Sequence, residues 1–306
     1  MKCRICGGKP VIYMPHHRLA LCREHFDSWF LKHLERTVKE FRMFSKDDGI
    51  LVAVSGGKDS LALWDALLRL GYRADGFYLD LGIGDYSKRS REAVERFAGE
   101  RGAKLIIRSL SEELGGIPLL VERTGRESCS VCGSVKRYFF NKVAKDHRYA
   151  VVVTGHNLDD EASSLLGNLL SWNLKYLGRK HPVLPQEGGF VRKAKPLCRF
   201  TEKETALYCL LRGIDYVEEE CPFSEGATSI FYKEILNRIE ERSPGTKMRF
   251  YLEYVRKVLP LFGQDSKESL GRCRVCGEPS PSEVCTFCSL RERVLNFIGT
   301  GRSSTG

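Results

Sequence analysis

Short apolar stretches rich in β-branched residues alternate with longer amphipathic stretches through the middle of the chain. The apolar stretches predict four strands, at residues 50–54, 75–81, 104–108 and 150–154. The amphipathic stretches predict helices at residues 60–70, 89–101, 132–147 and 158–170. Because a helix follows each strand, the pattern predicts an α/β fold with right-handed crossovers and a doubly wound parallel sheet.

Further helical stretches follow this core. Glu204 stands three residues after Thr201, the spacing of a capping box, so a helix is expected at residues 201–212. A basic stretch with several aromatic residues, 229–259, is also expected to be helical. The Gly/Ser-rich end, residues 299–306, is expected to be disordered.

The turn between the first strand and its helix carries the most informative motif, Ser55-Gly56-Gly57-Lys58-Asp59-Ser60. Glycines let the backbone approach an anion closely, and the start of a helix offers unpaired N–H groups and a positive dipole end. A Walker A loop needs four residues between its first Gly and the Gly-Lys-Ser/Thr, so this loop belongs to another class of phosphate-binding site. A turn without a ligand is the alternative interpretation, and the strand-to-helix context disfavours it.

A second polar segment, residues 154–162, follows the fourth strand at the same carboxyl edge of the sheet, where doubly wound folds bind ligands. Its residues Asp159, Asp160 and Glu161 offer the oxygen ligands that Mg²⁺ prefers. They also suit the first turn of a capped helix, because acidic groups complement the helix dipole. The two roles are compatible, and we expect a functional one beside the phosphate loop.

Composition and charge narrow the class of protein. The chain has 306 residues, with 49 Lys and Arg against 39 Asp and Glu, for a net charge of +10. A basic excess favours a polyanion such as nucleic acid as partner. Without an apolar run of roughly 20 residues or the apolar core of a signal peptide, the protein is expected to be cytoplasmic, with no membrane contact. The 12 cysteines are then expected to form metal or redox sites rather than disulfides.

Cysteine pairs near both ends have the spacing of structural zinc sites. The first set is Cys3-x-x-Cys6 with Cys22-x-x-His25, and the second is Cys273-x-x-Cys276 with Cys285-x-x-Cys288. Each set supplies four ligands for tetrahedral Zn²⁺. Without metal, these thiols would be oxidisable groups on short segments that lack an apolar core. The neighbouring His16 and His17 are expected to be surface residues rather than ligands.

Three central cysteines predict a different kind of site. Cys129-x-x-Cys132 stands alone as a pair, and Cys221 is a third candidate far along the chain. Three thiolates suit a [4Fe-4S] cluster with one iron open to a non-protein ligand. A redox-active or persulfide-carrying pair is the competing interpretation. Cys198 and Cys209 are expected to be buried and inert.

Together these motifs resemble the TtuA/TtcA family of tRNA thiolation enzymes, which are PP-loop ATP pyrophosphatases. The loop SGGKDS fits the family pattern SGGxDS, and the resemblance extends through the central cysteines and TGHNLDDEA over nearly the whole chain. Zinc sites at both ends are most similar to the TtuA branch, which thiolates 5-methyluridine 54 in the T-loop. Thiolases of wobble uridine 34 and of cytidine 32 are similar in the core, although the cytidine enzymes typically lack the zinc modules.

The resemblance implies the composition of the site. The family's ATP-binding residues correspond to Ala53, Val54, Ser55, Gly56, Gly57, Lys58, Asp59, Ser60, Asp80, Gly155, His156 and Asp160. Its cluster ligands correspond to Cys129, Cys132 and Cys221. Its catalytic residues correspond to Asp59, Lys136 and Asp160. The implied domains are an N-terminal zinc finger, a PP-loop catalytic domain and a C-terminal zinc ribbon with a tail, at residues 1–28, 29–262 and 263–306.

The implied activity has two steps: ATP adenylates the C2 oxygen of a tRNA uridine, and sulfur then displaces AMP. Mg²⁺ and Lys136 would offset the phosphoryl charge. Besides tRNA, the implied partners are a ubiquitin-like sulfur carrier with a C-terminal thiocarboxylate and a second copy of the chain. Basic segments at residues 179–181 and 192–195 are expected to hold the tRNA backbone. Alternative hypotheses are a cluster-free persulfide thiolase, a zinc-dependent RNA-binding module and a PP-loop ligase acting on a small molecule.

Overall fold

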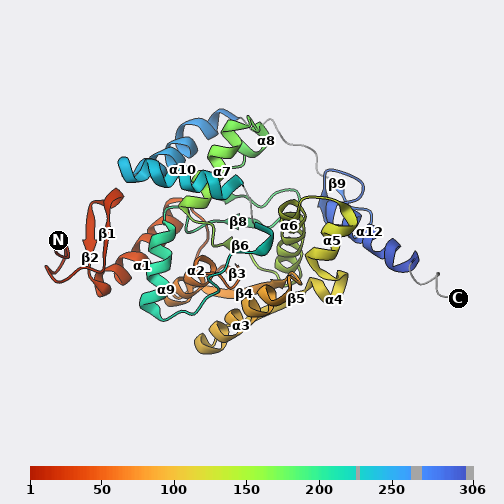
Figure 1. Ribbon diagram of the computed structural model, residues 1–306, viewed down its shortest axis with the longest axis horizontal. Coiled ribbons are helices and arrows are strands. Elements are labelled where there is room, and N and C mark those ends of the chain that lie inside the picture. Colours follow the sequence, from red (N-terminus) through yellow and green to blue (C-terminus); the bar gives the residue numbers. More distant parts are fainter. Residues whose placement is uncertain (225–227, 263–270, 301–306) are drawn as a thin grey trace.

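A six-stranded sheet forms the centre of the computed structural model, which describes residues 1–224, 228–262 and 271–300. Its strand order is β5-β4-β3-β6-β8-β7 (Figure 1). The first five of these strands run parallel, and β7 pairs antiparallel with β8 at the edge. The strand bounds are β3 Gly49–Val54, β4 Arg73–Asp80, β5 Leu105–Ser109, β6 Val151–Thr154, β7 Val183–Leu184 and β8 Arg192–Ala194.

The doubly wound parallel sheet and its four predicted strands are confirmed. Alternate residues of β3 show why the sheet is covered on both faces: Ile50 and Val52 belong to one buried cluster, and Leu51 belongs to another. Helices cover each face and complete these two cores. The two short strands β7 and β8 were not predicted, because β8 carries two basic residues in a stretch of three and lacks an apolar signature.

The helices within and after the sheet agree with the predicted pattern and add to it. Three of them begin earlier than predicted: α2 starts at Lys58, α3 at Gly84 and α6 at Ser128. The capping box of Thr201 and Glu204 is confirmed at the start of α9. The bounds are α1 Arg23–Glu40, α2 Lys58–Arg69, α3 Gly84–Arg101, α4 Leu110–Leu114, α5 Gly116–Thr124, α6 Ser128–Asp146, α7 Leu158–Leu170, α8 Leu174–Leu177 and α9 Glu202–Arg212.

The stretch at residues 229–259 is not one helix. It divides into α10 (Thr228–Arg242) and α11 (Thr246–Glu253), followed by a π-helical turn at Tyr254–Val258 and a 3-10 turn at Leu259–Phe262. The break falls at Pro244 and Gly245, where Gly245 has a φ of 90° that favours glycine.

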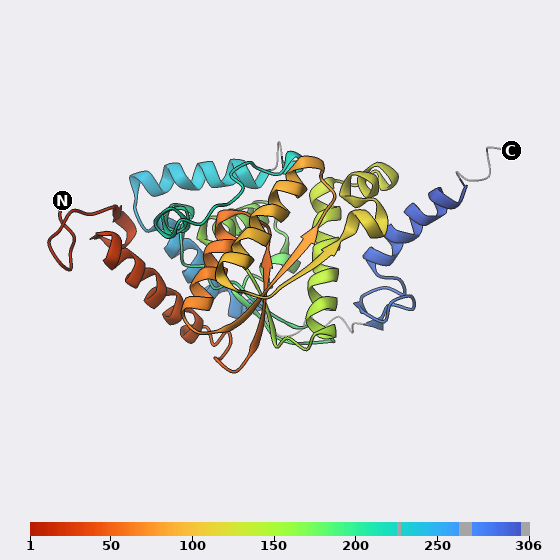
Figure 2. The ribbon, with the colours of Figure 1, turned by 90° about the horizontal axis from the view of Figure 1, so that it is seen from below.

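Two small cysteine-bearing modules lie at opposite ends of the molecule (Figures 1 and 2). The N-terminal module is a hairpin of β1 (Ile12–Met14) and β2 (Leu19–Leu21) that leads into α1. The C-terminal module is a hairpin of β9 (Gly271–Arg272) and β10 (Pro279–Ser280) that leads into α12 (Thr286–Thr300). α12 thus extends two residues into the predicted tail, and the remaining tail residues lie outside the described part.

The C-terminal module is attached to the middle of α6. Tyr138 and Phe287 stack with ring centroids 3.9 Å apart. The Asn141 amide donates a hydrogen bond of 2.6 Å to the Glu278 carboxylate, and Lys145 pairs with the same carboxylate at 2.7 Å.

Among the described helices, none combines the length and the apolar character needed to cross a membrane.

Candidate nucleotide and metal sites

The predicted phosphate loop connects β3 to α2 at the carboxyl edge of the sheet. Hydrogen bonds hold its shape: the Ser55 N–H donates to Ser60 Oγ at 3.1 Å, and Ser60 Oγ donates to the Gly57 carbonyl at 3.0 Å. Gly56 has a φ of 82°, and a Cβ there would lie 2.8 Å from the Ser90 carbonyl, so only glycine fits. The loop therefore presents the N-terminus of α2, whose first N–H groups have no acceptor within the helix.

Ser90 of α3 lies against this loop through its backbone, because its carbonyl oxygen is the atom that a side chain at position 56 would meet. The Ser90 hydroxyl is buried beside the phenol of Tyr86, one turn earlier on α3. The missing side chain at Gly56 and the free N–H groups at the start of α2 fit a phosphate-bearing ligand.

The second predicted segment packs directly on the phosphate loop. A Cβ at Gly155 would lie 2.8 Å from the Ser60 nitrogen, so the two loops touch through their backbones. Asn157 and Asp160 form a capping box at the start of α7, with bonds of 3.0 and 3.1 Å. Asp159, Asp160 and Glu161 thus lie in the first turn of α7, as the capped-helix interpretation predicted.

Asp59 joins three separate segments. Its Oδ1 accepts hydrogen bonds from Asn157 Nδ2 at 3.1 Å and from Thr205 Oγ1 at 2.5 Å, and its Oδ2 pairs with Lys58 at 3.1 Å. Asn157 lies on the second loop and Thr205 on α9, so this one carboxylate ties the phosphate loop to both. Both carboxylate oxygens of Asp59 accept bonds from protein donors, and these bonds position the phosphate loop.

Asp160 has a charged partner that the sequence analysis missed. The ammonium of Lys233, on α10, lies 2.6 Å from Asp160 Oδ1 and 2.5 Å from Glu202 Oε1. Burial alone would raise the pKa of Asp160, but the positive charge of Lys233 lowers it below its usual value. Asp160 is therefore ionised at neutral pH. No signal along the sequence pairs Lys233 with Asp160, because α7 and α10 meet only in the folded chain.

Two ion pairs bind the acidic segment to the rest of the protein, and the pair made by Asp159 is buried. Glu161 pairs with Lys195 at 2.7 Å, and Asp159 pairs with Lys247 of α11. Lys180 is also buried, and it donates to Ser164 Oγ at 2.5 Å. The ammonium groups of Lys180 and Lys195 thus bind within the protein. The expectation that the segments 179–181 and 192–195 hold RNA stays a prediction and rests on their other basic residues.

The three central cysteines lie near one another on α6 and on the chain after α9. Cys129 donates to the Phe223 carbonyl at 3.7 Å, which joins the start of α6 to the segment just after Cys221. Tyr86 of α3, Cys132 and Cys221 all pack against the same hydrophobic cluster. Burial raises the pKa of Tyr86, and the two thiols raise it further. Within the described residues, the three sulfurs do not form a set as compact as 4.8 Å.

This cysteine group is connected to the phosphate loop. The Val217 N–H donates to the Gly56 carbonyl at 2.9 Å, four residues before Cys221. Tyr86 lies one turn before Ser90 on α3, and Ser90 contacts Gly56. The loop and the cysteines thus share the same edge of the sheet.

The remaining predicted residues lie around this edge. Lys136 is half-buried on α6, one turn after Cys132. His156 is exposed, and its Nδ1 lies 2.7 Å from Thr154 Oγ1. Asp80 ends β4 and accepts the Gly82 N–H at 2.9 Å, and Ala53 and Val54 end β3. Cys198 and Cys209 are buried, as predicted, and burial raises the pKa of both thiols.

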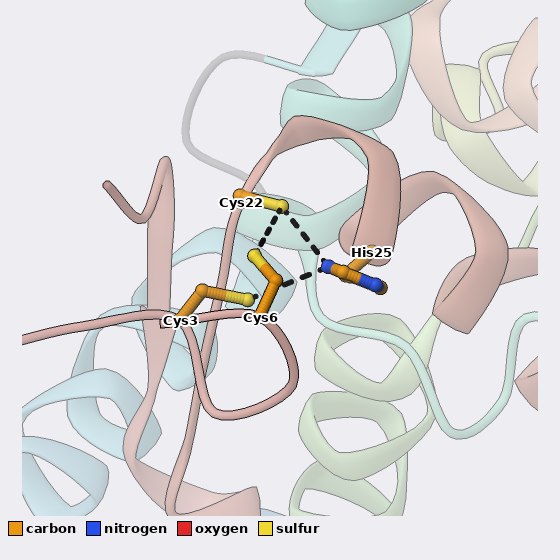
Figure 3. Close-up of side chains that lie close together, drawn as sticks. All are labelled: Cys3, Cys6, Cys22 and His25. Carbon is orange, nitrogen blue, oxygen red and sulfur yellow. Dashed lines mark hydrogen bonds between the residues drawn. The ribbon is translucent and has the colours of Figure 1, made fainter. Parts of the chain in front are cut away.

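The four predicted N-terminal ligands converge (Figure 3). Cys6 and Cys22 have their sulfurs 3.8 Å apart, and His25 Nδ1 lies 3.6 Å from the Cys3 sulfur and 3.1 Å from the Cys22 sulfur. Two sulfurs bound to one tetrahedral Zn²⁺ at 2.3 Å would be separated by about 3.8 Å. The set therefore fits a zinc ion.

The C-terminal set has the same character. The sulfurs of Cys276 and Cys285 are 3.7 Å apart, and all four ligand atoms lie within 4.8 Å of one another. The Cys285 N–H points at the Cys273 sulfur at 3.2 Å. Burial alone would raise the pKa of Cys273, but the N–H groups of Cys285 and Cys276 lower it to about 6. A thiolate at neutral pH is the form that binds metal.

Comparison with known proteins agrees with these sites. Residues 2–27 match the family described as the N-terminal LIM domain of the 2-thiouridine synthetase TtuA, and residues 30–225 match the PP-loop domain family. A tRNA-5-methyluridine(54) 2-sulfurtransferase of Thermus thermophilus is 48% identical over 295 residues, which are 96% of this chain and 92% of the relative. The chain belongs to the TtuA family of PP-loop tRNA sulfurtransferases. A relative of the same name from Pyrococcus horikoshii is 43% identical, with 97% of this chain and 96% of the relative covered.

A solved structure of this fold shows what one such protein contains. It is the U34-tRNA thiolase NcsA from Methanococcus maripaludis with its [4Fe-4S] cluster, and it superposes with a TM-score of 0.79. The sequences are 25% identical, and the match covers 95% of this chain and 96% of that one. The enzyme class and fold predicted from the sequence are thereby confirmed.

Proposed function

We propose that this protein is the ATP-dependent 2-sulfurtransferase of tRNA 5-methyluridine 54. The observation that carries the proposal is the connection between the nucleotide loop and the cysteine group, made by the Val217–Gly56 hydrogen bond and by α3. An enzyme that activates an oxygen with ATP and then replaces it with sulfur needs both sites to reach one base. The choice of position 54 rests on the named relatives at 48% and 43% identity.

In the first step, ATP would adenylate the C2 oxygen and release pyrophosphate. The N-terminus of α2 and residues 55–60 hold the phosphates, and the N–H groups there offset negative charge. Asp59 positions this loop through Asn157 and Thr205. Lys136 would contact the transferring phosphoryl group, and Asp160, ionised beside Lys233, would take part as a charged acceptor or through Mg²⁺.

In the second step, sulfur would attack C2 and AMP would leave. Cys129, Cys132 and Cys221 would hold a [4Fe-4S] cluster, because three thiolates spread wider than a zinc set match a larger centre with one open iron. The cluster would supply an electrophilic iron that binds inorganic sulfur. The role of the protein is to place this group beside the nucleotide loop.

The remaining components belong to the same proposal. The two terminal cysteine sets would each hold a structural Zn²⁺, and their modules would contact tRNA. A ubiquitin-like carrier with a C-terminal thiocarboxylate would deliver sulfur, and the enzyme would act as a cytoplasmic homodimer. The proposed domain limits remain residues 1–28, 29–262 and 263–306, although the first limit falls inside α1.

The experiment is anaerobic reconstitution with iron and sulfide, followed by thiolation of tRNA transcripts and mass analysis of nucleosides. Three substrates are compared: tRNA with 5-methyluridine 54, tRNA with unmodified uridine 34, and tRNA with cytidine 32. We expect 2-thiolation at position 54 together with AMP. Product at position 34 or 32 alone would contradict the site assignment while keeping the enzyme class.

The same experiment tests the rival chemistry. A colourless protein that thiolates tRNA without added iron would support a cysteine persulfide instead of a cluster. A protein that binds tRNA and forms no AMP would be an RNA-binding module.

A further inference from the structure

A third compact group of metal-type side chains lies where the N-terminal module meets α9. His16 and His17 come from the 3-10 turn Pro15–His17 between β1 and β2, and Glu204 comes from the first turn of α9. One ligand atom from each residue lies within 4.8 Å of the others. The only other such groups among the described residues are the two terminal cysteine sets. The prediction that His16 and His17 are surface residues is wrong, since both are partly buried.

Glu204 is a buried carboxylate with few partners. Its side chain is 1% exposed and that of His16 is 9% exposed, with His16 Nε2 3.0 Å from Glu204 Oε1. The other carboxylate oxygen accepts the Thr201 N–H at 2.7 Å. A carboxylate removed from water needs a positive partner. His16 and Glu204 share a hydrogen bond at this distance. Two ligands of a divalent zinc ion are separated by about 2.9 Å at a right angle and by about 3.4 Å at the tetrahedral angle, so an ion can replace the shared proton with little movement of the two groups.

His17 has a nitrogen available for a metal. Its Nε2 is buried and has no hydrogen-bond partner within the described ranges. The ring lies edge-on to Trp29 and His33, with centroids 5.3 and 5.4 Å away, and its centroid is 4.2 Å from that of His16.

The group also has a route to solvent. His16 lines a pocket of about 540 Å³ between the N-terminal module and the start of α11. Arg18 and Arg249 line the same pocket, so it favours an anion. Water or a small anion can therefore complete the coordination of an ion bound by His16, as in zinc sites with three protein ligands.

We propose that His16, His17 and Glu204 bind a third Zn²⁺, in a site of two imidazoles and one carboxylate. The ion connects the N-terminal module to α9. The residue after Glu204 is Thr205, which donates to Asp59 of the phosphate loop. Occupancy of this site therefore couples the position of the module to the position of the nucleotide site.

The test counts zinc on the full-length protein. Loosely bound metal is removed with a weak chelator, Zn²⁺ is titrated back, and bound zinc per chain is measured for the wild type, His17→Asn and Glu204→Gln. Gln at position 204 keeps an oxygen for the Thr201 N–H but loses the charge, so the helix cap survives. We expect the wild type to bind one equivalent more than either variant. The control is His147→Asn, at an exposed position after α6, which should bind as the wild type does.

Two results would overturn the proposal. Two equivalents of zinc in the wild type and in both variants would show that His16 and Glu204 share a proton only. Three equivalents in all three proteins would place the additional ion elsewhere. If His17→Asn fails to fold by circular dichroism, Glu204→Gln decides the outcome. As a second probe, Co²⁺ at this site should add visible absorption without the sulfur-to-metal band of the cysteine sites.

Discussion

The cysteine sites at the two ends of the chain and the three central cysteines are assembled in different ways. Each terminal set takes its ligands from one short module: two cysteines come from a turn before or within its hairpin, and two ligands come from the start of the following helix. One pair of sulfurs in each set lies 3.7–3.8 Å apart. The central group takes Cys129 and Cys132 from α6 and Cys221 from a distant segment, and its sulfurs are more widely spread. Four converging ligands leave no open position on a metal, whereas three leave one. The closed sites therefore suit stability, and the open one suits chemistry.

The two kinds of site are nevertheless attached to the same helix. α6 carries Cys129 and Cys132 in its first turns, and its middle holds the C-terminal module through Tyr138 and Asn141. If the C-terminal module became disordered, α6 would lose these contacts, and α6 carries two of the central cysteines. The predictions below separate the effects on chemistry from the effects on stability.

The largest effect is expected from Cys132→Ser. The change removes one of three ligands of the open site, so the anaerobic protein should lose its visible absorption and more than about 100-fold of its thiolation rate. The midpoint of thermal unfolding of the metal-free protein should change little, because Cys132 is only partly buried. The matched control is Cys198→Ser, at a buried cysteine outside the site. Thiolation by Cys132→Ser at the rate of the wild type would contradict the assignment of the chemistry to the central cysteines.

The second prediction concerns a closed site. Cys276→Ser should lower bound zinc by one equivalent per chain and destabilise the C-terminal module, since zinc binding supplies about 10 kcal/mol or more of folding free energy in small zinc domains. Limited proteolysis should then cleave within residues 271–300 while the sheet stays protected. The visible absorption of the central site should remain. Its loss in this variant would show that the two regions are not separable.

The parts that the sequence predicted are those in which the signal is local. The loop at residues 55–60, the capping box at Thr201 and both terminal cysteine sets lie within short segments, and all of them formed as predicted. Lys233 and Thr205 were missed, because they reach Asp160 and Asp59 only through tertiary packing. The helix α1 was also predictable from the sequence, because apolar residues recur in it at four-residue spacing and are buried: Phe26, Phe30, Leu34 and Val38. The prediction from alternating strands and helices did not use this spacing.

The third prediction concerns the nucleotide site, where Lys233 belongs to no metal site and acts through its positive charge. Lys233→Met should lower thiolation at pH 7 about 10-fold, because Asp160 and Glu202 lose their shared cation. Lys233 lowers the pKa of Asp160, so its removal leaves burial to raise that pKa. The acidic limb of the pH–rate profile should therefore move to higher pH in the variant.

A conservative variant tells charge from packing at this position. Lys233→Arg keeps the cation and should restore the pH profile of the wild type, whereas a purely structural role would leave both variants slow with an unchanged profile. Visible absorption should be the same in all three proteins, since Lys233 does not belong to the cysteine group. An acidic limb that stays in place in Lys233→Met would show that ionised Asp160 is not required.

The smallest effect is expected from Phe287→Leu, at the contact between the C-terminal module and α6. The side chain of Leu fills much of the same space but cannot stack on Tyr138, so the free energy of unfolding should fall by about 1 kcal/mol. Zinc content and visible absorption should match the wild type, because both sets of ligands are intact. Chemical denaturation with fluorescence detection measures the change, and Leu295→Ala, at an exposed position of α12, is the control. A loss of thiolation larger than this loss of stability would mean that the module holds α6 in the conformation that the central cysteines require.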